Sequence, residues 1–374
     1  MASPPLPKEK AVEAVEAVNK VGGNISRAAE LIGIARPTLE GRLRAAKLQG
    51  LAPEPRKLTT STSTLYDDKG NMRLQWVKED ARQNEQAAAM RAFLEELRQD
   101  KDTRAKPVLG PPAQPSNMLS SIVMGDAHFG MKAWMEETGE ADFDLKIAED
   151  ELKAAVSYLV STAPKAKYGL LVDVGDFMHV DNRKAMTPNG GNLLDVDTRY
   201  QKLCRIVVMT FRYCIGLMLK RFEKVRVIAC PGNHNQDSAG WITLALSVYY
   251  ENEPRVTIDT SPGAYFYHRF GNNLIGVTHG DRCKFADLIP IMATDRSKDW
   301  GETEHRHFLT GHIHHTKHQE FRGGFAESFN TLAPGDAWHA ASGYRSKRQM
   351  QRLDFHEKHG IISRAICNVG MLDI

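Results

Sequence analysis

Residues 118–130, MLSSIVMGDAHFG, contain the pattern that decides the fold: a short apolar run followed at once by a polar cluster. The pattern recurs before GDFMHVDN at 175–182, PGNHN at 231–235, HGD at 279–281 and GHIHH at 311–315. Short apolar runs of this kind are typical of buried strands, and helices predicted at 144–160 and 200–221 would cover the sheet faces. Polar residues at the C-terminal ends of such strands build a site at one sheet edge. We therefore predict an α/β fold with its site at that edge.

The polar clusters combine carboxylates, an amide oxygen and imidazoles. They supply Asp126, His128, Asp176, Asn233, His279, His312 and His314. This mixture of ligands suits Mn, Fe, Zn or similar divalent ions. Residues separated by one on an extended segment point the same way, so Asp126 with His128 can hold one ion, as can His312 with His314. Glycines before the ligands would allow the backbone to turn sharply and the ligands to crowd together.

Taken in order, D-x-H, G-D-x-x-H, G-N-H, H-G-D and G-H-x-H resemble the five signature blocks of calcineurin-like metallophosphoesterases, over residues 118–318. The resemblance implies a four-layer α/β/β/α sandwich. It also implies two divalent metal ions, for which we expect Mn²⁺, with Fe, Zn or Mg as alternatives. By this resemblance, the first ion is bound by Asp126, His128 and His314, the second by Asn233, His279 and His312, and Asp176 bridges the two.

His234 is expected to stay off the metals. In the family the equivalent histidine approaches the scissile phosphate, as a general acid or as a charge stabiliser. The resemblance implies hydrolysis by in-line attack of a hydroxide that bridges the two ions. The residue after His234 departs from the family pattern, because Asn235 stands where an acid is usual. This leaves the orientation of His234 open, with nearby Asp237 as a candidate substitute.

His179 stands where most phosphatases of the family carry a second acid, three residues after the bridging aspartate. This resembles the branch of SbcD-like DNA repair nucleases, in which that histidine positions the DNA phosphate or supports the catalytic histidine. We predict such a role for His179. The alternative is a structural histidine that only hydrogen-bonds a loop.

The first fifty residues have the pattern of a helix-turn-helix. A helix is predicted at 7–20, a short second helix follows, Gly33 makes a turn, and a third helix begins near Arg36. The stretch GGNISRAAELIGIARPTLEGRLRAAKL, residues 22–48, resembles the DNA-binding end of Fis-type proteins. Four cations of the third helix are predicted to contact DNA phosphates: Arg36, Arg42, Arg44 and Lys47. The alternative is a helical bundle used for protein contacts.

Composition divides the chain into a helix-turn-helix domain at 1–50, a connector at 51–116 and a metallophosphoesterase domain at 117–374. The connector is predicted to contain a hairpin around 63–78, a polar helix at 79–98 and an extended linker. The polar helix would be a spacer or would pair two copies into a homodimer. Because no window has the apolar length of a signal peptide or a membrane span, we expect a soluble, cytoplasmic protein without a membrane partner.

Taken together, the sequence predicts a metal-dependent phosphodiesterase that acts on DNA, most simply a nuclease. Two alternatives remain open at this point. One is a phosphomonoesterase or small-nucleotide phosphodiesterase, and the other is a DNA-binding regulator whose phosphoesterase domain senses or scaffolds.

Overall fold

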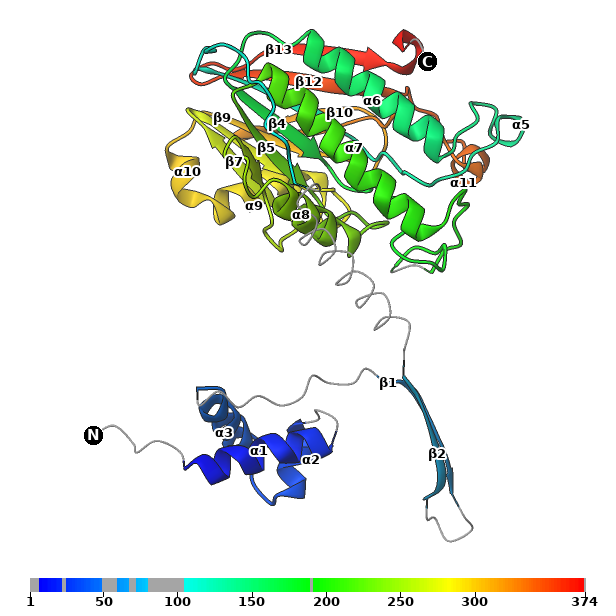
Figure 1. The fold of residues 1–374 in the computed structure, drawn as a ribbon, viewed down its shortest axis with the longest axis vertical. Coiled ribbons are helices and arrows are strands. Elements are labelled where there is room, and N and C mark those ends of the chain that lie inside the picture. The colour runs from blue at the N-terminus through cyan, green and yellow to red at the C-terminus, as the bar shows by residue number, and fades with distance from the viewer. Residues whose placement is uncertain are drawn as a thin grey trace. The chain divides into compact units, whose positions relative to one another are not determined.

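We describe a computed structural model of the chain, shown in Figure 1. It describes residues 7–21, 25–48, 59–66, 72–79, 104–188 and 191–372, with only the backbone for 47–48 and the strands at 59–66 and 72–79. The chain divides into two compact units, Met1–Phe93 and Leu94–Ile374. Among the described residues, no helix has both the length and the apolar character needed to span a membrane.

The first unit contains three short helices. They are α1 (Lys8–Lys20), α2 (Ile25–Leu31) and α3 (Arg36–Leu48). Gly33 turns the chain between α2 and α3 with φ of 64°, and buried Ala28, Ala29 and Leu39 form the centre of their core. The small alanines let the helices approach closely, as a helix-turn-helix requires. The predicted helices and turn are therefore present.

A hairpin follows in the same unit. Strands β1 (Thr59–Tyr66) and β2 (Met72–Glu79) pair antiparallel, as the sequence predicts. The tip predicted at Asp67–Gly70 and the polar helix predicted from Glu79 onward lie outside the described residues, apart from Glu79 itself, which ends β2.

The second unit has four layers: helices, a six-stranded sheet, a five-stranded sheet and a second helical layer (Figure 1). The first helical layer comprises α6 (Leu145–Ser161), α7 (Tyr200–Arg221) and α8 (Ser238–Tyr249), and the last comprises α9 (Leu288–Asp295) and α10 (Ser297–Gly301). Short α5 (Met135–Thr138) and α11 (Ala337–Ala341) lie in connections. This is the predicted α/β/β/α sandwich, and the helices predicted at 144–160 and 200–221 are confirmed within one residue at each end.

The six-stranded sheet has the order β13-β12-β3-β4-β5-β6, in which β3 to β6 are parallel. Its strands are β3 (Met118–Met124), β4 (Tyr168–Asp173), β5 (Lys224–Ala229), β6 (Val256–Ile258), β12 (Gln349–His356) and β13 (Gly360–Asn368). The five-stranded sheet has the order β10-β11-β9-β8-β7. Its strands are β7 (Phe266–Phe270), β8 (Asn273–Val277), β9 (His305–Thr310), β10 (Lys317–Phe321) and β11 (Gly324–Ser328).

The two faces of the central strands enter different cores. On β4, Leu170 and Val172 pack between the two sheets, whereas Leu171 packs against the helices. Because both faces are buried, such strands are continuous apolar runs, which is why the sequence marks them so clearly.

Residues 104–116, assigned to the connector from the sequence, pack along the second unit. The main-chain N–H of Ala105 donates to the carbonyl of Tyr249, and Arg255 donates to the carbonyl of Val108 at 2.7 Å. The main-chain N–H of Lys167 donates to the carbonyl of Pro115. The second unit therefore begins before residue 117.

Candidate metal centre

The five predicted ligand clusters meet at one edge of the sandwich. Three follow β3, β4 and β5 of one sheet, and two follow β8 and β9 of the other. Within the first sheet β3, β4 and β5 are parallel to one another, and within the second β8 and β9 are parallel, so the C-terminal ends of each set lie at one edge of their sheet. All seven predicted ligands are brought together there, although they span 188 positions of the sequence between Asp126 and His314.

One group of ligand atoms is formed by Asp126, His128 and His314, whose donor atoms lie within 4.8 Å of one another. The Nε2 atoms of His128 and His314 are 3.1 Å apart, and His314 Nε2 is 3.6 Å from Asp126 Oδ1. Nitrogen and oxygen ligands lie about 2.0–2.2 Å from a bound ion, so ligands of one ion stand about 3 Å apart. This group thus has the spacing of the predicted first metal site.

A second group surrounds the side-chain oxygen of Asn233. His279 Nε2 is 2.9 Å and His312 Nδ1 3.0 Å from Asn233 Oδ1, and His279 Nε2 is 3.1 Å from Asp176 Oδ2. His279 Nδ1 donates to the carbonyl of Val174 at 3.0 Å, which leaves its Nε2 directed at the two oxygens. The predicted second set of ligands is assembled, and Asp176 contributes to it.

The electrostatics of this region favour a bound cation. Burial alone would lower the pKa of His279, but the carboxylates of Asp176 and Asp126 raise it to about 10. Burial alone would raise the pKa of Asp176, and the interaction with His279 instead lowers it. The Oδ2 atom of Asp126 is buried without a hydrogen-bond partner among the described residues. An unpaired buried carboxylate oxygen is costly, and a divalent ion would satisfy it.

In the first group, His128 is suited to metal binding because the protein keeps its imidazole neutral. Burial lowers the pKa of His128 well below its usual range, followed in effect by the neighbouring His234, His314 and His179. A neutral imidazole has the lone pair that a metal requires.

The ligands sit on a strained backbone. Six described residues other than glycine have positive φ, and five of them are predicted ligands: Asp126 (29°), His128 (44°), Asp176 (53°), His312 (69°) and His314 (55°). Such conformations cost on the order of 1–3 kcal/mol each and concentrate at functional sites. The D-x-H and H-x-H segments are therefore not extended, which was the condition for His312 and His314 to hold one ion together. His312 lies in the second group and His314 in the first.

Two glycines fit directly against the ligands. A Cβ at Gly311 would lie 2.3 Å from Asp126 Oδ2, and one at Gly232 would lie 2.1 Å from Asp176 Oδ1. No side chain can occupy these positions without displacing a carboxylate. The predicted crowding of ligands against glycine is present at both positions.

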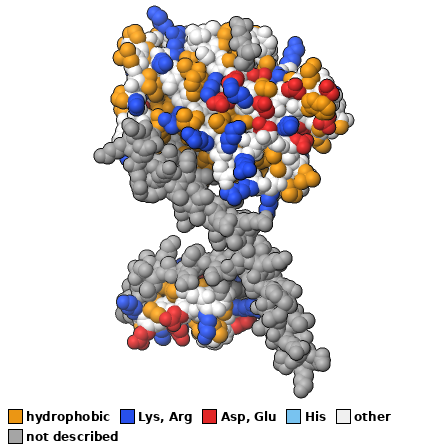
Figure 2. Space-filling view, turned by 45° about the vertical axis from the view of Figure 1, so that its right-hand side comes forward, with side chains coloured by type: hydrophobic (Ala, Val, Ile, Leu, Met, Phe, Trp, Pro, Cys, Tyr) orange, Lys and Arg blue, Asp and Glu red, His pale blue; other side chains and the backbone are white. Residues whose placement is uncertain are grey.

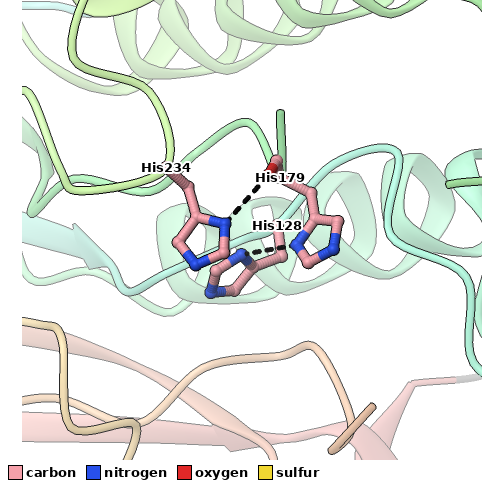
Figure 3. A group of neighbouring side chains, drawn as sticks. All are labelled: His128, His179 and His234. Carbon is pink, nitrogen blue, oxygen red and sulfur yellow. Dashed lines mark hydrogen bonds between the residues drawn. The ribbon is translucent and has the colours of Figure 1, made fainter. Parts of the chain in front are cut away.

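His234 lies beside His128 and His179 (Figure 3). Its Nδ1 donates to the main-chain carbonyl of His179 at 2.9 Å, and its main-chain N–H donates to Asp176 Oδ1 at 2.8 Å. The ring of His234 is thus oriented by the carbonyl of His179. Asp237, the candidate substitute for the missing acid, has an exposed side chain at the start of α8. The Nε2 of His234 remains available for a substrate.

His179 is buried, and its role follows from its contacts. Its ring stacks on His234 with centroids 5.1 Å apart, and its Nδ1 is 3.2 Å from His128 Nδ1 (Figure 3). Burial, and next the charge of His234, lower the pKa of His179 to about 3, so it stays neutral. The Nε2 atom of His179 is buried without a hydrogen-bond partner among the described residues, and its ring contacts both His128 and His234.

Asn235, which departs from the family pattern, has a structural task that the sequence did not reveal. Its side-chain Oδ1 accepts hydrogen bonds from the main-chain N–H groups of Asp176, at 3.1 Å, and Gly232, at 2.9 Å. It thereby joins the loops after β4 and β5, which carry Asp176 and Asn233. A carboxylate here could do the same but would add charge beside Asp176.

His339 is a further residue beside the first group of ligands. It stacks on His314 with centroids 5.1 Å apart, and its Nδ1 is 2.7 Å from Asp336 Oδ1. It belongs to the segment 330–349, whose aromatic and basic residues predict either a substrate rim or packing of the closing strands. His307 and His318, by contrast, stack on each other near Glu327, whose carboxylate is paired with Arg364. Neither histidine belongs to the two groups formed by the seven predicted ligands.

The predicted DNA-contacting cations on α3 differ in their surroundings. Arg42 Nη1 is 2.8 Å from Glu13 Oε2 of α1, and its side chain is 16% exposed. Arg36 is exposed and pairs with Glu40 at 2.9 Å, and Arg44 is exposed with a hydrogen bond to the carbonyl of Glu40. The side chain of Lys47 lies outside the described residues.

Comparison with known proteins bears on each unit separately. Similar solved structures include a conserved uncharacterized protein, a predicted phosphoesterase, from Streptococcus pneumoniae TIGR4, at 10% identity over 68% of this chain and 99% of that chain, with a TM-score of 0.28. Wild-type Vps29 complexed with Zn²⁺ from Entamoeba histolytica is 11% identical over 67% of this chain and 99% of that chain, with a TM-score of 0.24. Phosphopantetheinyl hydrolase from Mycobacterium tuberculosis is 12% identical over 58% and 91%, with a TM-score of 0.25.

No curated protein matches the chain by sequence. The family described as bacterial regulatory protein, Fis family, matches residues 15–45. These residues include the end of α1, all of α2 and most of α3. The predicted Fis-type helix-turn-helix at the N-terminus is thereby confirmed.

Proposed function

We propose that the second unit is a dinuclear metal-dependent phosphodiesterase and that its substrate is DNA. The observation that carries the proposal is the convergence of seven predicted ligands at one edge of the two sheets, where a buried carboxylate oxygen of Asp126 has no hydrogen-bond partner among the described residues. Asp126, His128 and His314 would hold one ion, Asn233, His279 and His312 the other, and Asp176 would contact both. When bound, two such ions lower the pKa of water, orient a phosphate and neutralise the charge that develops during its displacement.

The protein's own residues would complete the chemistry. With Nδ1 donating to the His179 carbonyl, His234 is fixed in one ring orientation and can present an Nε2 proton to the leaving oxygen of a phosphate ester. His179 supports this orientation from behind by stacking on His234. No covalent bond between enzyme and substrate is required.

DNA is favoured as the substrate by the helix-turn-helix match in the same chain. A polymer-binding unit joined to a hydrolytic centre raises the local concentration of the polymer at that centre. The histidine at position 179, in place of a second acid, adds support for the nuclease branch of the resemblance. Cleavage mode and the SbcD-like relationship stay predictions.

The test is a panel of substrates with Mn²⁺: p-nitrophenyl phosphate, bis-p-nitrophenyl phosphate, and labelled linear, circular, single-stranded and double-stranded DNA. We expect hydrolysis of the diester and of DNA, and little hydrolysis of the monoester. Asp176→Asn serves as the matched inactive control. Hydrolysis of the monoester alone would favour the phosphomonoesterase alternative, and no hydrolysis by a metal-loaded protein would favour the sensing regulator.

A further inference from the structure

The segment of α11 next to the metal centre carries two large aromatic side chains that the fold does not bury. Trp338 is 64% exposed and Tyr344 is 57% exposed. Their rings nevertheless stack on each other, with centroids 5.6 Å apart and planes 23° from parallel. The side of the second unit that carries α11 in Figure 1 comes forward in Figure 2, where hydrophobic side chains are visible at the surface.

Local hydrogen bonds hold this aromatic pair in place. Asp336 caps α11 by accepting from the main-chain N–H of His339 at 2.9 Å. Gly343, with φ of 78°, then turns the chain, and the main-chain N–H of Tyr344 donates to the carbonyl of His339. The two rings therefore form a preorganised stack, which a planar ligand can extend without the protein first losing much conformational entropy.

A chain of ring contacts joins this surface to the metal centre. The ring of Trp338 contacts that of His339 edge-on with centroids 5.1 Å apart, and His339 stacks on His314 at 5.1 Å. Only one side chain thus stands between Trp338 and a predicted metal ligand. The two centroid distances place the ring of Trp338 within about 10 Å of the ring of His314.

The charges beside the surface suit a phosphate backbone. Arg345 and Lys347 follow Tyr344 closely, both are exposed, and neither pairs with an acid of the described residues. Exposed aromatic rings beside cations are the arrangement by which proteins bind single-stranded nucleic acid, because every base has a face that can stack.

We infer that Trp338 and Tyr344 form a stacking platform for an unpaired nucleobase next to the scissile phosphate. The inference rests on the proposed function and makes it more specific: the strand at the centre is single-stranded or locally unpaired. A base within a duplex presents only its edges and could not use this platform.

The experiment measures kcat/KM with Mn²⁺ on a labelled single-stranded oligonucleotide and on the same strand with single bases removed in turn. For the wild type, removing the base that stacks should lower kcat/KM by about 5- to 150-fold, the range expected for one base–aromatic stack. Trp338→Ala should lower it by a similar factor on the intact strand, and removing the same base should then have no further effect. Trp338→Phe, which keeps a ring, should recover most of the loss.

Tyr213→Ala is the matched control, because Tyr213 is 41% exposed on α7, in the helical layer. It should behave as the wild type on every strand. Metal content of Trp338→Ala should equal that of the wild type, which separates loss of the platform from loss of the centre.

Additive losses from the substitution and the missing base would overturn the platform. The platform would also be overturned if Trp338→Ala had the kcat/KM of the wild type on every strand. The same holds if the only effect of Trp338→Ala were a change in self-association, measured by sedimentation. If the wild type hydrolyses no DNA, the proposed function fails instead. The platform is then tested by fluorescence anisotropy, which measures the affinity of the wild type and of Trp338→Ala for the intact strand and for the abasic strand. Equal affinities in all four combinations would reject it.

Discussion

Five predicted ligands adopt left-handed backbone conformations that non-glycine residues rarely adopt. Neighbouring ligand atoms lie about 3 Å apart, the spacing expected of ligands that share one ion. These five residues are held at a cost in conformational energy, and bound metal would offset that cost.

Asp176 is the ligand whose loss should be felt most widely. Its Oδ2 faces His279 and its Oδ1 accepts from the main-chain N–H of His234. Asp176→Asn removes a negative charge while keeping the shape, so we expect weakened binding at both sites. Elemental analysis of the purified protein should fall from two ions to one or none. Two retained ions, or full activity, would contradict a bridging role.

His234 and His279 should respond differently to replacement by alanine. His234→Ala should keep both metals and lose about 10²–10⁴-fold in kcat, the usual contribution of general acid–base catalysis. His279→Ala removes a ring that faces Asn233 and Asp176, so it should lose metal first. The comparison requires metal content and kcat for both variants. Equal loss of metal in the two would show that this division of roles is wrong.

At the scale of elements, the loops after the parallel strands hold the site, and their glycines determine how closely the ligands approach. Gly311 follows β9 and contacts the Asp126 carboxylate, which follows β3 in the other sheet. The two sheets therefore meet at the metal centre through a glycine and a carboxylate.

Gly311→Ala tests this contact, because its methyl group would lie 2.3 Å from Asp126 Oδ2. Displacing a ligand by a fraction of an ångström to one ångström should lower activity by up to about 10²-fold. Gly216→Ala in α7 is the control, since nothing lies within 4 Å of its added methyl group. That helical substitution should stabilise the protein by about 0.5–1 kcal/mol and leave metal content unchanged. Denaturant unfolding and metal analysis measure both effects.

At the scale of the whole molecule, the chain joins a Fis-type helix-turn-helix to a four-layer α/β/β/α unit. The two units have separate cores, and the first supplies none of the predicted metal ligands. In the proposed function, both units act on the same DNA molecule.

Arg44→Ala should weaken DNA binding and lower the slope of log K against log salt by about one, because one phosphate contact is lost. Arg42→Ala should act differently. Its guanidinium pairs with Glu13 between α3 and α1, so its loss should destabilise the helical unit more than it changes the slope. Binding titrations at several salt concentrations, with thermal unfolding of each variant, separate the two. Deleting residues 1–50 should give the largest loss of DNA affinity, and unchanged affinity would assign this unit to protein contacts.

Much of this architecture follows from the sequence because its signals are local. Apolar runs such as 118–124 predict strands, the helix at 200–221 follows from its periodicity, and the polar residues after each strand identify the ligands. These patterns depend on residues a few positions apart, so neighbouring side chains are sufficient to set them.

The tertiary structure decided what depends on residues far apart in the chain. In the folded protein Arg42 pairs with Glu13, and buried His179 contacts His128. Asn235 hydrogen-bonds to the loop after β4. Trp338 is exposed, and only the ring of His339 lies between it and His314. None of these contacts is indicated by a periodic pattern or a fixed residue spacing in the sequence. Each depends on which loops the packing of two sheets brings to the same edge, because only the folded core fixes the distance between residues that the chain separates.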